Sequence, residues 1–189
     1  MTKRHTFCVY VEDKPGVLNR IASLFRRRAF NIESLTVGHT ETPGVSRMTI
    51  LVNCDEHGAR RLEANLYKLV NVLRVHDITS EAAVYRELVM IKVATTTPEA
   101  RVHVLQLVDV FRARVVDVSP DSVVVETTGA EEKIEGLLDV LRPHGVLELV
   151  RTGRVGMVRG PRGVEVEAPR PARPEPSASA DDENVSYSV

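Results

Sequence analysis

The strongest constraint on the fold is an internal repeat, because one order of β-rich and helix-like segments occurs twice in the first 160 residues. Each copy runs as a β-rich segment, an amphipathic stripe, two more β-rich segments, a second stripe and a final β-rich segment. The copies start about 80 residues apart, near Thr6 and Glu87. Because crossover connections are right-handed, two βαββαβ units predict an α+β protein of two tandem ferredoxin-like sandwiches, each with two helices on one face of an antiparallel sheet.

The elements expected from these patterns can be given by residue range. The first copy is predicted to form strands over 6–11, 31–40, 46–54 and 72–78, and helices over 15–28 and 59–69. The second copy is predicted to form strands over 87–93, 115–118, 122–126 and 146–150, and helices over 98–111 and 130–141. Pro15 suits a first helical turn, where its missing N–H would be unpaired anyway. The helix over 98–111 is expected to turn Val102, Leu105 and Val108 inward. One face of each sheet carries no helix, so we expect the chain to dimerise.

A change of composition marks the end of the repeat. From Pro161 onward lie five of the ten prolines, three arginines, six acidic residues and almost no large apolar side chains. Such a segment cannot bury enough surface to offset the entropy of ordering it. We therefore predict two folded domains, over 5–79 and 84–160, and a disordered Pro-rich acidic tail over 161–189.

Charge and composition exclude several classes of protein. The formal net charge is −1, whereas a dedicated nucleic-acid binder usually shows a clear basic excess. No apolar run approaches the roughly 18–20 residues of a membrane span, and the N-terminal residues do not resemble a signal peptide. The two cysteines exclude a disulfide scaffold, and a reducing cytoplasm is the simplest location.

No residues have the spacing of a catalytic or metal site. Cys8 and Cys54 stand far apart without a CxxC motif, and no two histidines are three or four residues apart. The two thiols could meet at one end of adjacent strands, but separate buried thiols are the simpler interpretation. The segment 44–48 lacks the second glycine of a serine-nucleophile elbow, and the glycines of 153–160 have no phosphate-loop spacing. We therefore expect no catalytic residues and no metal.

The best candidate binding site is the loop Asp13-Lys14-Pro15-Gly16, which joins a strand to a helix. The unpaired N–H groups at a helix N-terminus attract an anion such as a carboxylate, and Gly16 removes a side chain that would block its approach. Asp13 adds a counter-charge for an ammonium group, so the loop suits the head of a free amino acid. The alternative is that Asp13 merely caps the helix and nothing binds.

Asn31 is a second candidate, at the start of the next predicted strand. Within one copy of the sandwich, the crossover separates Asn31 from the Asp13 loop. Across a dimer the two could converge. The alternative is that Asn31 only begins a strand.

These residues resemble a known family. The run Glu12–Leu18 followed by Asn31-Ile32 is similar to the ACT domain, an amino-acid-sensing module. Further stretches resemble the small, regulatory subunit of acetolactate synthase, over about residues 5–160. These stretches are 31–37 with 46–50, 66–75 and 153–160.

The resemblance implies a non-catalytic partner of a large subunit that carries thiamine diphosphate, Mg²⁺ and FAD and catalyses the first shared step of valine, leucine and isoleucine synthesis. It implies that this chain activates the large subunit and makes it sensitive to valine bound between two ACT domains of a homodimer. On matching positions, one end of valine would contact Asp13 and residues 14–18 (Lys14, Pro15, Gly16, Val17 and Leu18). Asn31 and Ile32 of the facing chain would contact the other end. Many valine-sensitive members have Asn in place of Asp13.

Two other functions remain open at this stage. An ACT-type sensor could serve a different enzyme, with the same loop. An RNA-recognition domain shares the βαββαβ order, but it places aromatic residues on both central strands to stack bases. Here Phe7 and Tyr10 lie on the first central strand and the run 48–52 has none.

Overall fold

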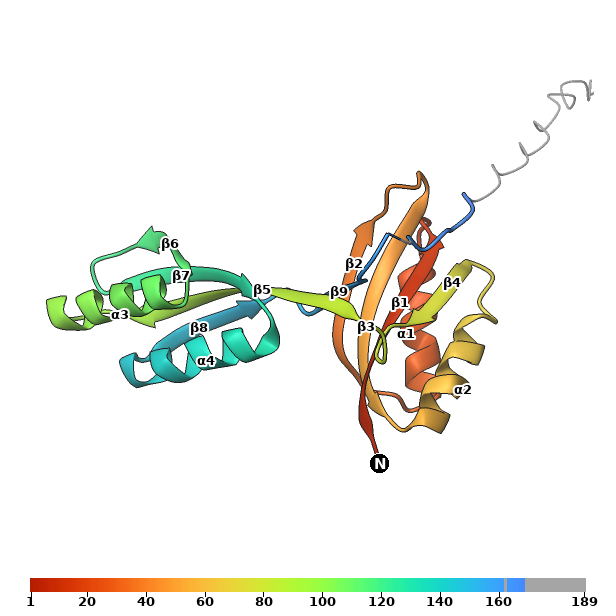
Figure 1. The fold of residues 1–189 in the computed structure, drawn as a ribbon, viewed down its shortest axis with the longest axis horizontal. Coiled ribbons are helices and arrows are strands. Elements are labelled where there is room, and N and C mark those ends of the chain that lie inside the picture. Colours follow the sequence, from red (N-terminus) through yellow and green to blue (C-terminus); the bar gives the residue numbers. More distant parts are fainter. Residues whose placement is uncertain (162, 169–189) are drawn as a thin grey trace, which may run out of the picture.

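The computed structural model describes residues 1–161 and 163–168. Two sandwiches of sheet and helices lie at opposite ends of an elongated molecule, joined by a narrow middle through which the long strand β5 passes (Figure 1). The predicted class, two tandem ferredoxin-like α+β sandwiches, is confirmed. Among the described residues, no helix has the length and apolar character needed to cross a membrane.

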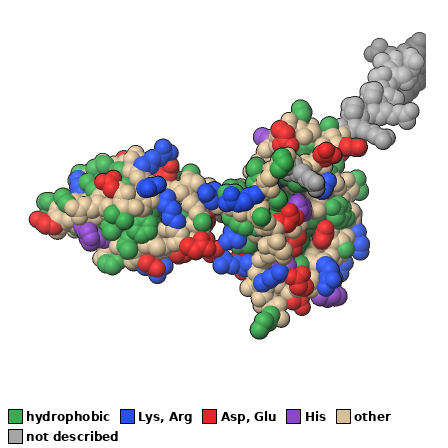
Figure 2. All heavy atoms as spheres, viewed as in Figure 1, with side chains coloured by type: hydrophobic (Ala, Val, Ile, Leu, Met, Phe, Trp, Pro, Cys, Tyr) green, Lys and Arg blue, Asp and Glu red, His purple; other side chains and the backbone are tan. Residues whose placement is uncertain are grey.

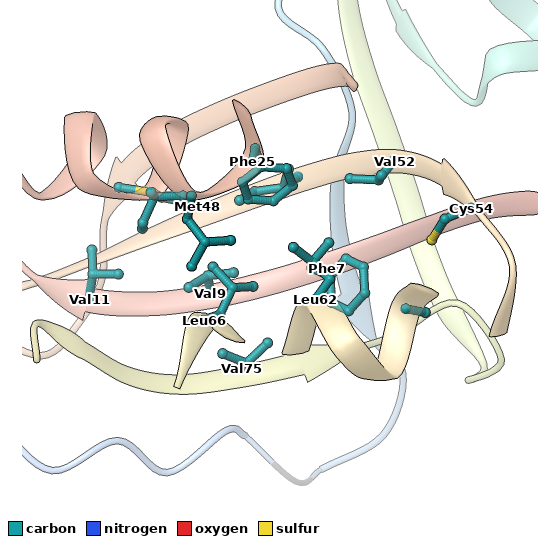
Figure 3. Close-up of a cluster of buried hydrophobic side chains, with 14 of the residues drawn as sticks. Phe7, Val9, Val11, Phe25, Met48, Val52, Cys54, Leu62, Leu66 and Val75 are labelled. Atoms are coloured by element: carbon teal, nitrogen blue, oxygen red, sulfur yellow. The ribbon is translucent and has the colours of Figure 1, made fainter. Parts of the chain in front are cut away.

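The first sandwich is a four-stranded antiparallel sheet in the order β2-β3-β1-β4 with two helices on one face. Alternation along the central strand β1 sends Phe7, Val9 and Val11 toward the helices, where they are fully buried. The cluster between the sheet and the helices is drawn in Figure 3. The elements are β1 (Lys3–Glu12), α1 (Val17–Arg27), β2 (Ile32–His39), β3 (Val45–Cys54), α2 (Glu56–Leu66) and β4 (Val72–Asp77).

Both helices of the first sandwich begin at other residues than predicted. Pro15 lies in the loop, outside α1, because the chain enters the helix through Gly16. Helix α2 begins at Glu56 rather than at Ala59, since the Asp55 side chain accepts a hydrogen bond from the Gly58 N–H at 2.7 Å and caps the helix.

The second sandwich repeats the architecture with the strand order β6-β7-β5-β8. The inward stripe predicted for its first helix was right only at Val108: Val104 and Val108 are buried, whereas Val102 and Leu105 are exposed. Apolar residues occupy several faces of this helix, so spacing alone did not select the inner one. The elements are β5 (Ala83–Ala94), α3 (Pro98–Val110), β6 (Arg114–Val118), β7 (Ser122–Gly129), α4 (Glu131–Leu141), a short 3₁₀ turn η1 (Arg142–His144), β8 (Val146–Arg151) and β9 (Val155–Val158).

The prediction that one face of each sheet is left open was wrong for the first sheet. Strand β5 starts four residues earlier than expected, and its first residues pair with β9, a strand that was not predicted. This two-stranded ribbon lies on the helix-free face of the first sheet, where Tyr85 and Val158 pack against Cys8, Tyr10 and Ile78. The chain therefore covers that face with its own residues.

Two glycines explain how closely the ribbon approaches the first sheet. A Cβ on Gly156 would lie 2.8 Å from the Tyr85 ring and 2.9 Å from the Ile78 side chain. Gly153 has φ of 87°, and a Cβ there would lie 2.4 Å from Ser34 Oγ. Ser34 Oγ in turn accepts the Arg154 N–H at 3.0 Å, which ties the turn before β9 to strand β2. These contacts give Gly153 and Gly156 a structural role.

The predicted tail over 161–189 lies mostly outside the described residues. In its described part, 161 and 163–168, Val164 and Val166 pack against the covered face of the first sheet. The Glu165 carbonyl oxygen also accepts a hydrogen bond from Arg74 at 3.2 Å.

Candidate functional site

The corner between β1 and α1 has an open backbone conformation. Gly16 is the N-cap of α1 and has φ of 82°, a left-handed conformation that favours glycine. A Cβ built on Gly16 would meet no atom of residues 1–161 or 163–168 within 4 Å. The backbone at this corner therefore faces open space, and a ligand could approach it closely.

No side chain among the described residues caps α1, and the alternative in which Asp13 caps this helix is wrong. The Val17 N–H makes a long contact of 3.4 Å with the Lys14 carbonyl. The N–H groups of Gly16, Leu18 and Asn19 meet no acceptor among the described residues. Unpaired N–H groups at the positive end of a helix dipole attract a carboxylate.

Asp13 is held by the neighbouring hairpin. Its N–H donates to the Gly44 carbonyl at 2.8 Å, and its Oδ1 accepts from Ser46 Oγ at 3.2 Å. Its Oδ2 lies 3.4 Å from His39 Nδ1, at the end of β2. The carboxylate is thus oriented beside the corner and half-exposed, in a position to meet an ammonium group.

A second set of contacts fixes the other side of the loop. Glu12 Oε2 lies 3.0 Å from Lys14 Nζ and accepts a hydrogen bond from Asn71. These two partners hold the pKa of Glu12 below its ordinary value. Asn71 Oδ1 accepts from Arg20 of α1 at 2.8 Å. The Lys14 ammonium is therefore engaged with Glu12, which leaves the backbone as the donor surface of the corner.

The second sandwich offers an internal comparison, since its own first strand-to-helix corner is closed. Thr97 caps α3 by accepting the Ala100 N–H at 3.2 Å, and Pro98 removes another N–H. Arg101 donates across this corner to the Ser119 carbonyl at 2.7 Å. Of the two equivalent corners, the one before α3 has a side-chain cap, whereas the one at Gly16 has none among the described residues.

Asn31 and Ile32 lie at the far end of the same sheet. In the ladder between β2 and β3, Ile32 pairs with Val52 whereas His39 pairs with Ser46. Six residues of β3 separate these pairs, or about 20 Å at the rise of a strand. Within one chain, Asn31 therefore does not meet the Asp13 corner, as the crossover predicted.

Two features of the site were missed. His39 and Ser46 orient Asp13, and the only signal for them was their position at the two ends of one predicted hairpin turn. The outer edge of β2, which pairs with no described strand, could have been identified from the strand order of a βαββαβ unit.

The other chemical candidates do not form a site. Cys8 pairs with Thr49 and Cys54 pairs with Lys3, so the two thiols do not meet at one strand end. Both are buried, which raises the pKa of each. No cluster of three or more potential metal ligands occurs among residues 1–161 and 163–168.

The RNA-recognition alternative is not supported by the aromatic residues. Phe7 is fully buried between the sheet and the helices. Tyr10 lies on the other face, but the ribbon covers it and leaves 7% of it exposed. Neither ring is available for stacking on a base.

Comparison with known proteins assigns both halves of the chain to one family. Residues 86–160 match the family model described as the small subunit of acetolactate synthase, and residues 7–74 match the AHAS small subunit-like ACT domain. A probable acetolactate synthase small subunit of Archaeoglobus fulgidus is 51% identical over 157 residues, which cover 83% of this chain and 98% of the relative. The acetolactate synthase small subunit of Mycobacterium bovis is 49% identical, with 86% and 96% covered.

A solved structure agrees with these matches. The crystal structure of the acetolactate synthase small subunit from Thermotoga maritima superimposes with a TM-score of 0.78 at 40% identity. The match covers 85% of this chain and 99% of that chain. The chain therefore belongs to the family of acetolactate synthase small subunits, the regulatory partners of a catalytic large subunit.

Proposed function

We propose that this chain activates the catalytic subunit of acetolactate synthase and makes it subject to feedback inhibition by valine. The catalytic subunit, and not this chain, would carry thiamine diphosphate, Mg²⁺ and FAD. The observation that carries the proposal is the uncapped corner at Gly16, beside an oriented carboxylate. The domain over 5–79 would then bind the amino acid, and the domain over 84–160 would be linked to it structurally.

The corner and the half-exposed carboxylate suit a zwitterion. The ligand carboxylate would accept from the N–H groups of Gly16 and Leu18, at the positive end of α1. The ammonium group would lie against Asp13. The backbone from Lys14 to Val17 would line the base of the ligand site, and the exposed Leu18 side chain would contact the apolar part of the ligand. Because one methylene is worth about 1–3 kcal/mol in an apolar pocket, leucine or isoleucine would compete with valine.

A homodimer through the free edges of β2 would complete the site. Antiparallel pairing of two β2 strands places the start of one against the end of the other. With Leu35 on the symmetry axis, Asn31 would lie opposite His39 of the second copy, and His39 contacts Asp13. Asn31 and Ile32 of one copy would then reach a ligand at the corner of the other.

Strand β2 also supplies a route from the ligand to the second sandwich. Ser34 and Thr36 lie on β2 a few residues from Asn31. Ser34 accepts the Arg154 N–H, and Thr36 Oγ1 donates to the Thr152 carbonyl at 3.3 Å. A shift of β2 on ligand binding would therefore move the turn that positions the second sandwich.

Inhibition would follow from linkage. Valine binds one arrangement of the dimer better, and the other arrangement activates the catalytic subunit. A coupling free energy of about 1–3 kcal/mol changes affinity roughly 5–150-fold, and the effect is reciprocal between valine and the catalytic subunit.

The experiment is the variant Gly16→Asp, assayed with purified catalytic subunit at increasing valine. The new carboxylate would occupy the place of the ligand carboxylate and repel it. We expect activation to persist and the valine concentration for half-inhibition to rise about tenfold or more.

Gly160→Asp is the matched control, because Gly160 also has a positive φ, of 105°, and open space around its Cβ. It should leave valine inhibition unchanged. Unaltered inhibition in Gly16→Asp, or an equal effect in Gly160→Asp, would count against the site.

A further inference from the structure

The ribbon of β5 and β9 has two apolar faces, and only one of them packs against the described part of the first sandwich. Alternation along the ladder sends Tyr85, Gly156 and Val158 toward the first sheet. The opposite face carries Val84 directly across from Met157, and Arg86 across from Val155. This outer face makes no contact with either hydrophobic core.

A mostly apolar groove of about 360 Å³ is lined by the residues of the outer face together with Arg47 of β3 and the neighbouring Gly156 and Val158. Met157 is 67% exposed and Val155 is 42% exposed, although both lie in a strand whose other face is buried. Contiguous exposed apolar surface on a folded protein marks an interaction site more often than chance. The lining residues are Arg47, Val84, Arg86, Val155, Gly156, Met157 and Val158.

Positive charge stands at both ends of this apolar strip. Arg86 closes one end, and Arg159 follows Val158 at the other, where its N–H donates to the Ala82 carbonyl at 2.7 Å. Both arginines are exposed, and neither forms an ion pair with a described residue, unlike Arg151 and Arg154 nearby. Figure 2 shows Lys and Arg atoms gathered at the narrow middle of the molecule, where the ribbon lies.

We propose that the outer face of the β5–β9 ribbon docks an apolar segment of the catalytic large subunit that is flanked by carboxylates. A second copy of this chain fits less well, because a two-fold axis through the ribbon would bring arginines against arginines. The proposal deepens the proposed function and rests on it, since the docked subunit is the one to be activated. The location of the ribbon also suits a regulatory contact. Its inner face packs on the first sheet, and β5 continues into the second sandwich, so a subunit docked on its outer face would be coupled to both sandwiches.

The test is the affinity of the full chain for the purified catalytic subunit, measured by biolayer interferometry at several salt concentrations. Met157→Glu removes apolar surface and adds a like charge facing the partner. We expect its affinity to fall about tenfold or more, as at the centre of an interface. Arg86→Gln should weaken binding less and flatten the salt dependence, because it removes one of the screened charges.

Leu147→Glu is the matched control, since Leu147 is 60% exposed and lies on β8 of the second sandwich, away from the ribbon. It should leave the affinity unchanged, and circular dichroism should show all three variants folded. Unreduced affinity in Met157→Glu, or an equal loss in Leu147→Glu, would overturn the proposal. So would a change in the sedimentation of Met157→Glu alone, which would make the ribbon an interface between copies. If the unmodified chain binds the catalytic subunit without raising its activity, the proposed function fails while the docking surface stands.

Discussion

Asp13 shapes the ligand corner without closing it. One of its carboxylate oxygens accepts a hydrogen bond from Ser46 Oγ at 3.2 Å, and the other lies 3.4 Å from His39 Nδ1. Both partners are on the neighbouring hairpin. An aspartate in this position ordinarily caps the helix that follows it. Here Gly16 lies between Asp13 and α1 in a left-handed conformation. The Asp13 side chain therefore does not reach the first N–H groups of α1, and they stay unpaired among the described residues. The residue that sequence patterns assign to capping is thereby left for a ligand.

A pair of substitutions at Asp13 tests its role toward the ammonium group. Asp13→Ala removes the acceptor, and the valine concentration for half-inhibition should rise about fivefold or more, as for a lost charged hydrogen bond. Asp13→Asn keeps an oxygen acceptor, so the change should stay below about threefold. The measurement is a valine titration of the reconstituted enzyme. Tighter inhibition in both variants would show that Asp13 repels the ligand instead of binding it.

The repeat extends to the way the first helix of each sandwich ends. Ala29 after α1 and Arg112 after α3 both have positive φ, of 56° and 49°. In each case the N–H of the following residue donates a hydrogen bond to a carbonyl of the helix. Phe30 N–H donates to the Phe25 carbonyl at 3.0 Å, and Ala113 N–H donates to the Val108 carbonyl at 2.8 Å. This is the helix ending at which glycine is usual, because a Cβ is strained there.

Ala29→Gly should therefore stabilise the protein. The relief of strain exceeds the entropy that glycine adds to the unfolded chain, and we expect a gain of about 0.5–1 kcal/mol in the free energy of unfolding. Chemical denaturation measures it. Ala22→Gly, at an exposed position within α1, is the control and should cost about 0.5–1 kcal/mol. A loss of stability in Ala29→Gly would contradict the assigned backbone strain.

Elements with a clear apolar period could be predicted, and those defined by tertiary contact could not. The apolar stripe predicted for α1 comprises Val17, Leu18, Ile21, Leu24 and Phe25, and all of it except the exposed Leu18 is buried. In α3 apolar residues occupy too many positions for spacing to select a face. Strand β9 has four residues, and it is a strand because Gly156 lets it lie against Tyr85, a contact that no local pattern contains.

At the scale of the whole molecule, the two sandwiches are linked by polar contacts at the narrow middle. Glu131, at the start of α4, pairs with Arg4 of β1 at 2.7 Å and with Arg154 beside β9. The hydrogen bond from Arg4, followed by the nearby positive charges, holds the pKa of Glu131 below its ordinary value of 4.5. The corner at Gly16 was predictable because it is local, whereas the ribbon and this linkage depend on residues far apart in the sequence.

The lowered pKa of Glu131 gives a pH dependence with a definite sign. A carboxyl group with a lowered pKa in the folded state stabilises that state above the unfolded pKa of 4.5, and loses the effect as the pH falls through the folded pKa. Glu131→Gln should therefore lower the thermal midpoint at neutral pH, and the difference between the two proteins should shrink as the pH falls below 4.5. Thermal unfolding of both proteins across this range measures it. A midpoint difference that does not change with pH would contradict the linkage.

The measurement that tests the central claim most directly is calorimetry of valine binding to the chain alone and to its complex with the catalytic subunit. Reciprocal coupling predicts weaker binding to the active complex, by roughly 5–150-fold, and Gly16→Asp should bind valine about tenfold or more weakly in either state. Equal affinity in the two states, or full binding by Gly16→Asp, would contradict the account.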